Sequence, residues 1–125
     1  EQILRIMKKL VLAAVFAIIG IGLNAQDTKV VKEEFYANGN LKSQFVEVNR
    51  SLVQATYYFE TGIINETGFF ENDKLSGQWK TYNSNSELLA IGYFTDNKKS
   101  GTWSFYQDGS KFKEVSYSGS QIAKN

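Results

Sequence analysis

The side chains of this chain that could do chemistry are carboxylates, amides, hydroxyls, lysines and many aromatic rings. Its 125 residues include no His and no Cys, but 2 Trp, 7 Tyr and 9 Phe. Without imidazole or thiol, the chain cannot build a Ser-His-Asp or Cys-His nucleophile, a His/Cys zinc site or a disulfide. The chemistries that remain are acid–base work by paired carboxylates and binding through aromatic surfaces.

The carboxylates show no spacing typical of an active site. A glycosidase needs two carboxylates about 5 to 10 Å apart, and charges that alternate along strand surfaces account better for these acids. Asn72-Asp73 and Asp96-Asn97 lack the ordered ligands of an EF-hand loop and are typical of turns. We therefore predict no enzyme, no catalytic residue, no metal site and no cofactor. The acids considered are Glu33, Glu34, Glu47, Glu60, Glu66 and Glu71.

The aromatic residues recur with a fixed spacing. The segment 77–82, Gly-Gln-Trp-Lys-Thr-Tyr, returns 24 residues later as the segment 101–106, Gly-Thr-Trp-Ser-Phe-Tyr. A repeat of 20 to 50 residues is the signature of a stacked array. The aromatic residue before each turn falls in steps of 23, 23 and 24, which predicts four units, at Tyr36, Phe59, Tyr82 and Tyr106.

Each unit reads as two short strands joined by turns. Asn38-Gly39 and Asp108-Gly109 are hairpin signals, because Asn, Asp and Gly tolerate positive φ. The residues between the turns alternate in polarity and are rich in β-branched and aromatic types, and no helical period follows the first 26 residues. The prediction is an all-β chain, an open antiparallel meander of about four hairpin repeats of 23 to 24 residues.

The repeat places large rings beside glycines. A glycine in a strand leaves bare backbone that a neighbouring ring can cover, so the rungs could be the core of a thin sheet. Alternatively, one exposed row of rings receives a partner. Trp79 and Tyr82 differ by three and point to opposite faces unless a bulge intervenes. The candidate binding residues are Trp79, Tyr82, Tyr93, Trp103 and Tyr106, and the structural glycines are Gly68, Gly77, Gly92 and Gly101.

The first 26 residues differ from the rest. Lys8 and Lys9 precede an apolar run over 10–23, which ends in Asn24-Ala25. This order is typical of a secretory signal peptide, and the run is shorter than the ~20 residues of a membrane-spanning helix. We predict a signal peptide over 1–25 with its start at Met7, a repeat domain over 26–125, and an exported protein, periplasmic or secreted. An uncleaved signal anchor is the alternative.

The charge balance bears on partners. Residues 26–125 carry 11 basic and 12 acidic residues, a net charge of about −1. Nucleic acid normally requires a clustered basic face, so we predict no nucleic-acid partner. The basic spots at Lys98-Lys99 and at Lys111 with Lys113 are too small to hold an anionic bilayer by charge alone.

The repeat unit resembles a known family. Gly-x-Trp-x-x-Tyr, a short turn and a strand ending in Gly-x-Phe/Tyr are similar to the MORN repeat in its bacterial variant, found in YwqK-like antitoxins. The resemblance runs from Tyr36 to about Gly119 and rests on the two central units, through Gly77, Trp79, Tyr82, Gly92, Tyr93, Gly101, Trp103 and Tyr106. It implies a β-hairpin array with a non-enzymatic role in protein contact or membrane association, and an antitoxin-like function.

Two functions from different classes follow. The first is an exported protein that contacts another protein, or a second copy of itself through an open sheet edge. The second is a peripheral envelope protein that associates with lipid through its aromatic face. The absence of a basic cluster favours protein contact.

Overall fold

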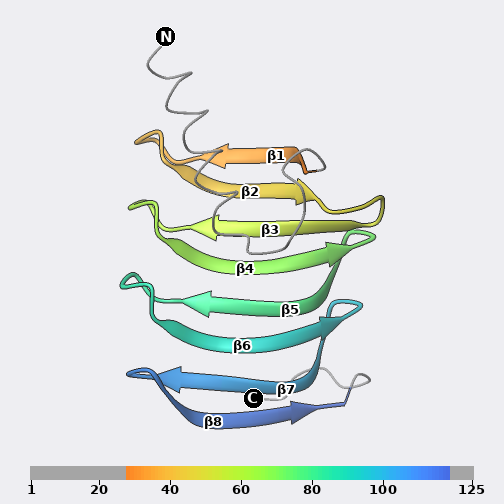
Figure 1. Ribbon diagram of the computed structural model, residues 1–125, viewed down its shortest axis with the longest axis vertical. Coiled ribbons are helices and arrows are strands. Elements are labelled where there is room, and N and C mark those ends of the chain that lie inside the picture. The colour runs from red at the N-terminus through yellow and green to blue at the C-terminus, as the bar shows by residue number, and fades with distance from the viewer. Residues whose placement is uncertain (1–27, 119–125) are drawn as a thin grey trace.

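Eight strands follow one another along the chain, and each pairs antiparallel with the next in one open sheet (Figure 1). This computed structural model describes residues 28–118, so the predicted signal peptide lies outside the described residues. The predicted all-β meander of hairpins is confirmed. No helix within 28–118 is long and apolar enough to span a membrane. The strands are β1 (Lys29–Phe35), β2 (Leu41–Glu47), β3 (Leu52–Tyr58), β4 (Ile64–Glu71), β5 (Lys74–Tyr82), β6 (Leu88–Thr95), β7 (Lys98–Gln107) and β8 (Ser110–Tyr117).

Three of the turns share one geometry. In the turn between β1 and β2, Gly39 N donates to Tyr36 O at 3.0 Å and Tyr36 N donates to Asn40 O at 2.8 Å. This pattern is a tight turn followed by one residue in the left-handed region. The same position recurs between β3 and β4 and between β5 and β6, and its occupants are Gly39 (φ 88°), Gly62 (φ 89°) and Ser86 (φ 65°).

The turns after β4 and β6 are of a second kind. Both central residues have positive φ, at Asn72 and Asp73 and again at Asp96 and Asn97. Two-residue turns of this type match the twist of the strands that they join. Asn97 also connects neighbouring units, because its N donates to Leu75 O at 3.1 Å and its Oδ1 accepts from Leu75 N at 2.8 Å.

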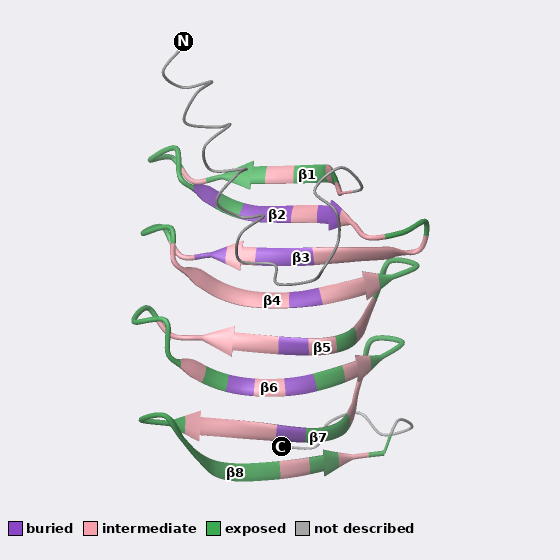
Figure 2. Ribbon diagram, in the orientation of Figure 1, coloured by how far each residue is buried: buried purple, intermediate pink, exposed green. Residues whose placement is uncertain are grey.

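Burial is concentrated in the six inner strands (Figure 2). Neither β1 nor β8 contains a buried residue. A small cluster of Leu41, Tyr58 and Ile64 lies at the ends of β2, β3 and β4. Burial there raises the pKa of Tyr58 to about 12, with a smaller contribution from the charge of Glu33. Most of the remaining apolar contact within 28–118 comes from rings laid on the sheet itself.

Replacing Ser86 by glycine should stabilise the turn between β5 and β6. Its φ of 65° is a conformation that glycine adopts without the steric cost of a Cβ atom. We expect Ser86→Gly to raise the free energy of unfolding by about 0.5 to 1 kcal/mol in urea denaturation followed by circular dichroism. The control is Ser84→Gly in the same turn, which we expect to be neutral or destabilising. Equal effects of the two substitutions would contradict this account of the turn.

Candidate functional site

The Gly-x-Trp segment forms a bulge. Between β4 and β5 the register passes from Thr67↔Lys80 to Phe69↔Ser76, so one residue of β4 faces three residues of β5. Gly77 lies within this irregularity with φ 70°. The same shift occurs between β6 and β7, where Gly101 has φ 63°. The glycine is therefore required for a left-handed residue within the bulge.

Each bulge seats a tryptophan on the glycine of the preceding strand. A Cβ added to Gly68 would lie 2.0 Å from Trp79 Cε2, and one added to Gly92 would lie 1.9 Å from Trp103 Cδ2. Only a glycine leaves room for a ring this close. The two rings are 6% and 8% exposed. Trp103 Nε1 donates to Tyr93 O at 3.1 Å, whereas the buried Trp79 Nε1 has no partner within 28–118.

In the first unit the large and the small residue exchange places. By register, Ala55 of β3 takes the place of Trp79, and Phe45 of β2 takes the place of Gly68. Ala55 is 0% exposed, and the pairing of β2 with β3 shows no register shift. Within residues 28–118, the shift in which one residue faces three is therefore found only where Gly-x-Trp occurs.

The rings on this face form one continuous row, which we call the ladder. Neighbouring centroids are 5.2 to 6.4 Å apart, and most pairs meet edge to face. These are the separations that aromatic pairs prefer. The row crosses the strands from β2 to β8, and its members are Phe45, Tyr57, Phe70, Trp79, Phe94, Trp103 and Tyr117.

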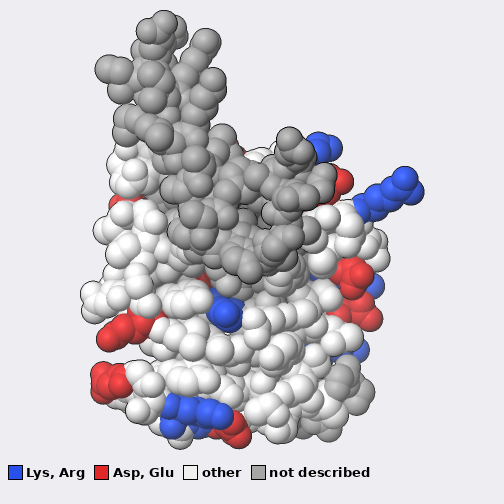
Figure 3. Space-filling model, in the orientation of Figure 1, with Lys and Arg blue, Asp and Glu red and all other residues white. Residues whose placement is uncertain are grey.

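Lysines flank the ladder. Lys99 Nζ lies 4.7 Å from the centroid of Trp103 and 5.6 Å from that of Tyr117, and Lys32 Nζ lies 5.5 Å from that of Phe45. Contacts of this kind contribute roughly 0.5 to 1 kcal/mol at exposed sites. Charges of both signs are interspersed on the visible side of the molecule (Figure 3).

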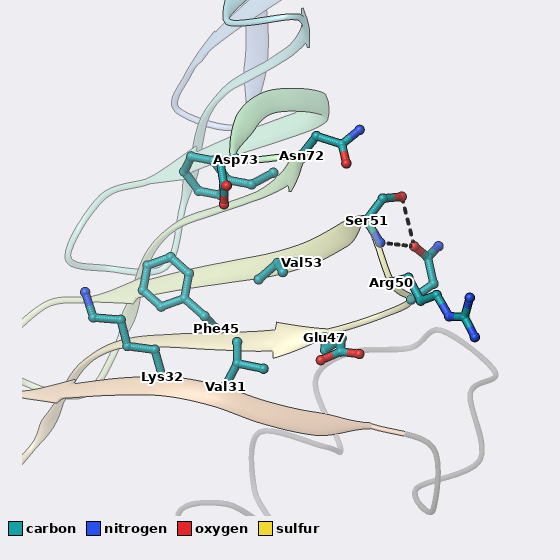
Figure 4. A pocket seen from close by; sticks show the side chains of 11 residues that line it. Val31, Lys32, Phe45, Glu47, Arg50, Ser51, Val53, Asn72 and Asp73 are labelled. Carbon is teal, nitrogen blue, oxygen red and sulfur yellow. Dashed lines mark hydrogen bonds between the residues drawn. The ribbon is translucent and has the colours of Figure 1, made fainter.

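The ladder face is hollowed in two places that adjoin at Phe70. The first hollow has a volume of about 510 Å³ and the second about 590 Å³. Figure 4 shows Val31, Phe45 and Val53 side by side in the first hollow, with Arg50 and Ser51 on the turn at its end. The second hollow is lined by rings of the ladder and by Glu66, Thr81 and Lys99. We call the two hollows together the trough.

One half-buried carboxylate of the trough, that of Glu66, has no partner within residues 28–118. Burial raises the pKa of Glu66 above its ordinary value. Elsewhere on this face, Lys32 and Ser43 contact Glu34 and hold its pKa low, and Lys29 Nζ lies 3.6 Å from Glu47 Oε2. Among residues 28–118, no hydrogen bond or ion pair reaches the carboxylate of Glu66. Burial, with the charges of Glu66 and Glu34, also raises the pKa of Tyr57.

The structure divides the predicted binding residues among three places. Trp79 and Trp103 belong to the ladder. Tyr93 lies between Gly92 and Phe94 on its strand and points to the opposite face, where it is 41% exposed and its hydroxyl accepts from Gln78 Nε2. Tyr82 is the last residue of β5 and Tyr106 the last but one of β7, and each lies beside a register shift. The shift beside Tyr82 has its extra residue, Leu89, on β6 and not between Trp79 and Tyr82. Tyr82 makes no ring contact with Trp79 among the described residues.

The phenylalanines of the ladder lie with the tryptophans, a grouping that the repeat pattern alone does not predict. The signal was available, since Phe70 and Phe94 stand two residues after Gly68 and Gly92 and must share their face. Tyr57 and Phe45 follow only from the observed register of the first unit. Glu66 had been considered as an acid of an active site and not as part of an aromatic surface.

The two hollows contain few acidic residues. No group of three or more Asp and Glu within 28–118 could hold a metal ion. The second hollow contains Glu66 as its one acid, and the first contains Glu47 and Asp73. A surface of rings with isolated charges can bind a ligand by contact area and charge.

Comparisons with known proteins identify no family for this chain. No family model matches the chain, and no curated protein matches it. A crystal structure of TarM is similar over 85% of this chain, with a TM-score of 0.49 and 12% identity. The match covers 21% of the TarM chain, so this chain spans about a fifth of that protein's length. At this TM-score the likeness supports no argument, and the resemblance to the MORN repeat stays a prediction.

The close contact between Trp103 and Gly92 predicts that one methyl group added to Gly92 will lower the stability of the fold. Gly92→Ala places a Cβ inside the indole ring, so the ring must leave its seat. We expect the free energy of unfolding to fall by about 2 to 3 kcal/mol in urea denaturation. In a Trp103→Leu background the same substitution should cost less than about 0.5 kcal/mol, because the clash is gone. An equal cost in the two backgrounds would show that Gly92 is needed for another reason.

Glu66 predicts a dependence of stability on pH. Burial raises the pKa of the Glu66 carboxyl in the folded protein above its value in the unfolded chain. As the pH rises from the unfolded to the folded pKa, Glu66 therefore ionises more readily in the unfolded chain, and the free energy of unfolding falls. We expect Glu66→Gln to be more stable than the wild type by about 0.5 to 1 kcal/mol at pH 7, and equal to it at pH 3.

The control for this pH dependence is Glu114→Gln. Lys111 pairs with Glu114 and lowers its pKa, so this substitution should show no gain at pH 7. A gain for Glu114→Gln as large as that for Glu66→Gln would assign the effect to net charge instead of burial.

Proposed function

We propose that this chain is a non-enzymatic interaction protein whose trough receives an extended segment of a partner protein. The observation that carries the proposal is the continuous ladder of half-buried rings along two adjoining hollows of one sheet face. Aromatic residues are enriched in the cores of protein interfaces, where they supply large contact areas with little loss of conformational freedom.

The dimensions of the trough suit a peptide chain. Its lining residues run from β1 to β7, which is about 29 Å at the usual spacing of strands. An extended segment of roughly nine residues has this length. A segment that crosses the strands contacts successive rings of the ladder, so each unit of the repeat adds one portion of the binding surface.

The charges of the trough favour a protein over a bilayer. Three acids, Glu47, Glu66 and Asp73, line it together with three basic residues, Lys32, Arg50 and Lys99. Anionic headgroups attract basic clusters, and carboxylates within the same surface oppose that attraction. Association with lipid through the aromatic face is therefore the second candidate.

The proposal extends to location and biological role. The order of charge and apolar residues before residue 26 supports export, and the resemblance of the repeat to the MORN variant supports an antitoxin-like role. An antitoxin-like role requires contact with another protein, and the trough would supply the surface for that contact.

Peptide display tests the proposal. Random dodecapeptides are selected on the purified protein, and the affinities of synthetic copies are measured by fluorescence anisotropy. We expect Phe70→Ala to weaken binding at least tenfold, because Phe70 lines both hollows. The controls are Tyr93→Ala on the opposite face and Phe112→Ala on β8, where the ring is 62% exposed, and both should bind normally. Circular dichroism and thermal unfolding establish that each variant is folded.

Two results would overturn the proposal. One is a selection that yields no peptide, or only peptides whose affinity depends on Tyr93 or Phe112 instead of Phe70. The other comes from sedimentation with phosphatidylcholine and phosphatidylglycerol vesicles. Pelleting of the wild type that Phe70→Ala abolishes would assign the trough to lipid.

A further inference from the structure

The second hollow of the trough combines one acid with the faces of two rings. Glu66 on β4 is in register with Tyr57 on β3 and with Thr81 on β5, and all three line the hollow. The centroids of Tyr57 and Trp79 are 6.3 Å apart, with an angle of 31° between the planes. A carboxylate therefore lies at one end of a short aromatic floor.

The half-buried carboxylate of Glu66 has no compensating partner within residues 28–118. Neither Lys99, the cation of the same hollow, nor any other basic residue of 28–118 forms an ion pair with it. Lys99 lies instead over Trp103 and Tyr117. A partly buried acid without a partner lowers stability, and such groups concentrate where a ligand supplies the missing partner.

The two charges of the hollow lie at different levels along the strands. Glu66 is level with Thr81, whereas Lys99 is level with Phe94, which pairs with Gly77. Four residues of β5 separate the two levels, a distance of about 13 Å along a strand. A cation that enters the hollow is repelled at the Lys99 level and attracted at the Glu66 level.

We propose that this hollow is the specificity site of the trough and takes a basic side chain, Lys or Arg, of the partner segment. The inference rests on the proposed function. The alkyl stem would pack over Tyr57 and Trp79, as long basic side chains do on apolar surfaces. The ammonium or guanidinium group would donate to the Glu66 carboxylate, a charge-assisted hydrogen bond, and lie within reach of the ring faces.

Binding of capped tripeptides tests the preference for a basic side chain separately from the proposed binding of peptides in the trough. The probes are Ac-Tyr-Lys-Tyr-NH2, its Arg and Glu analogues, and the norleucine analogue, which keeps the alkyl stem without the charge. Affinities for the purified protein come from titrations of its two indole N–H signals by NMR, since Trp79 and Trp103 both line the hollow. We expect the Lys and Arg peptides to bind three- to tenfold more tightly than the norleucine peptide, and the Glu peptide to bind most weakly.

The variants give the decisive comparison. Glu66→Gln should remove the preference for Lys over norleucine and leave the norleucine peptide bound as before, whereas Glu114→Gln on β8 should retain the preference. Equal binding of Lys and norleucine by the wild type, or a preference that persists in Glu66→Gln, overturns the inference and leaves the trough intact. If no peptide binds, the proposed function fails together with the inference.

Discussion

A sheet without a second layer must bury its apolar surface against itself, and here it does so by laying rings on bare backbone. No element within residues 28–118 covers either face of the sheet. Trp79 and Trp103 are nonetheless more than nine-tenths buried, because each rests on a glycine and is flanked by other aromatic rings. Large aromatic residues supply several kcal/mol when buried, so two such seats are a substantial share of a small domain's stability. The bulge, the left-handed glycine and the ladder all serve this one contact.

The spacing of turns and rings predicted the architecture, because both are local properties. Turn residues that tolerate positive φ, such as Asn72-Asp73, act over four residues, and the repeat predicted eight strands from them. The face of each ring was harder to predict, since a single bulge changes which residues lie opposite one another. Tyr93 and Tyr82 were therefore grouped with Trp79, although only Trp79 belongs to the ladder. Gly-x-Trp itself is the signal of the one-against-three bulge, and β2 and β3 of the first unit, which lack it, pair without a shift.

The open edges bear on which surface meets a partner. β1 has register shifts near both ends, and β8 carries Lys111 and Lys113, and bulges and lysines both discourage pairing at an edge. Two copies of β8 that pair antiparallel about Phe112, Lys113 or Glu114 would set like charges opposite each other, which is destabilising. Self-association through an edge stays a prediction, but these features favour the ladder face as the surface of contact.

Stability and binding place different demands on the same row of rings. Trp79 and Trp103 are buried because the fold needs them, while Phe45, Tyr57, Phe70 and Phe94 remain half-exposed along the trough. A sheet selected for stability alone would pair or remove an acid such as Glu66, whose burial disfavours its charged form. Glu66 breaks the rule that a buried charge has a partner, and departures from such rules concentrate at functional sites. The unpaired carboxylate is therefore best understood as a cost in stability that a basic partner group would offset.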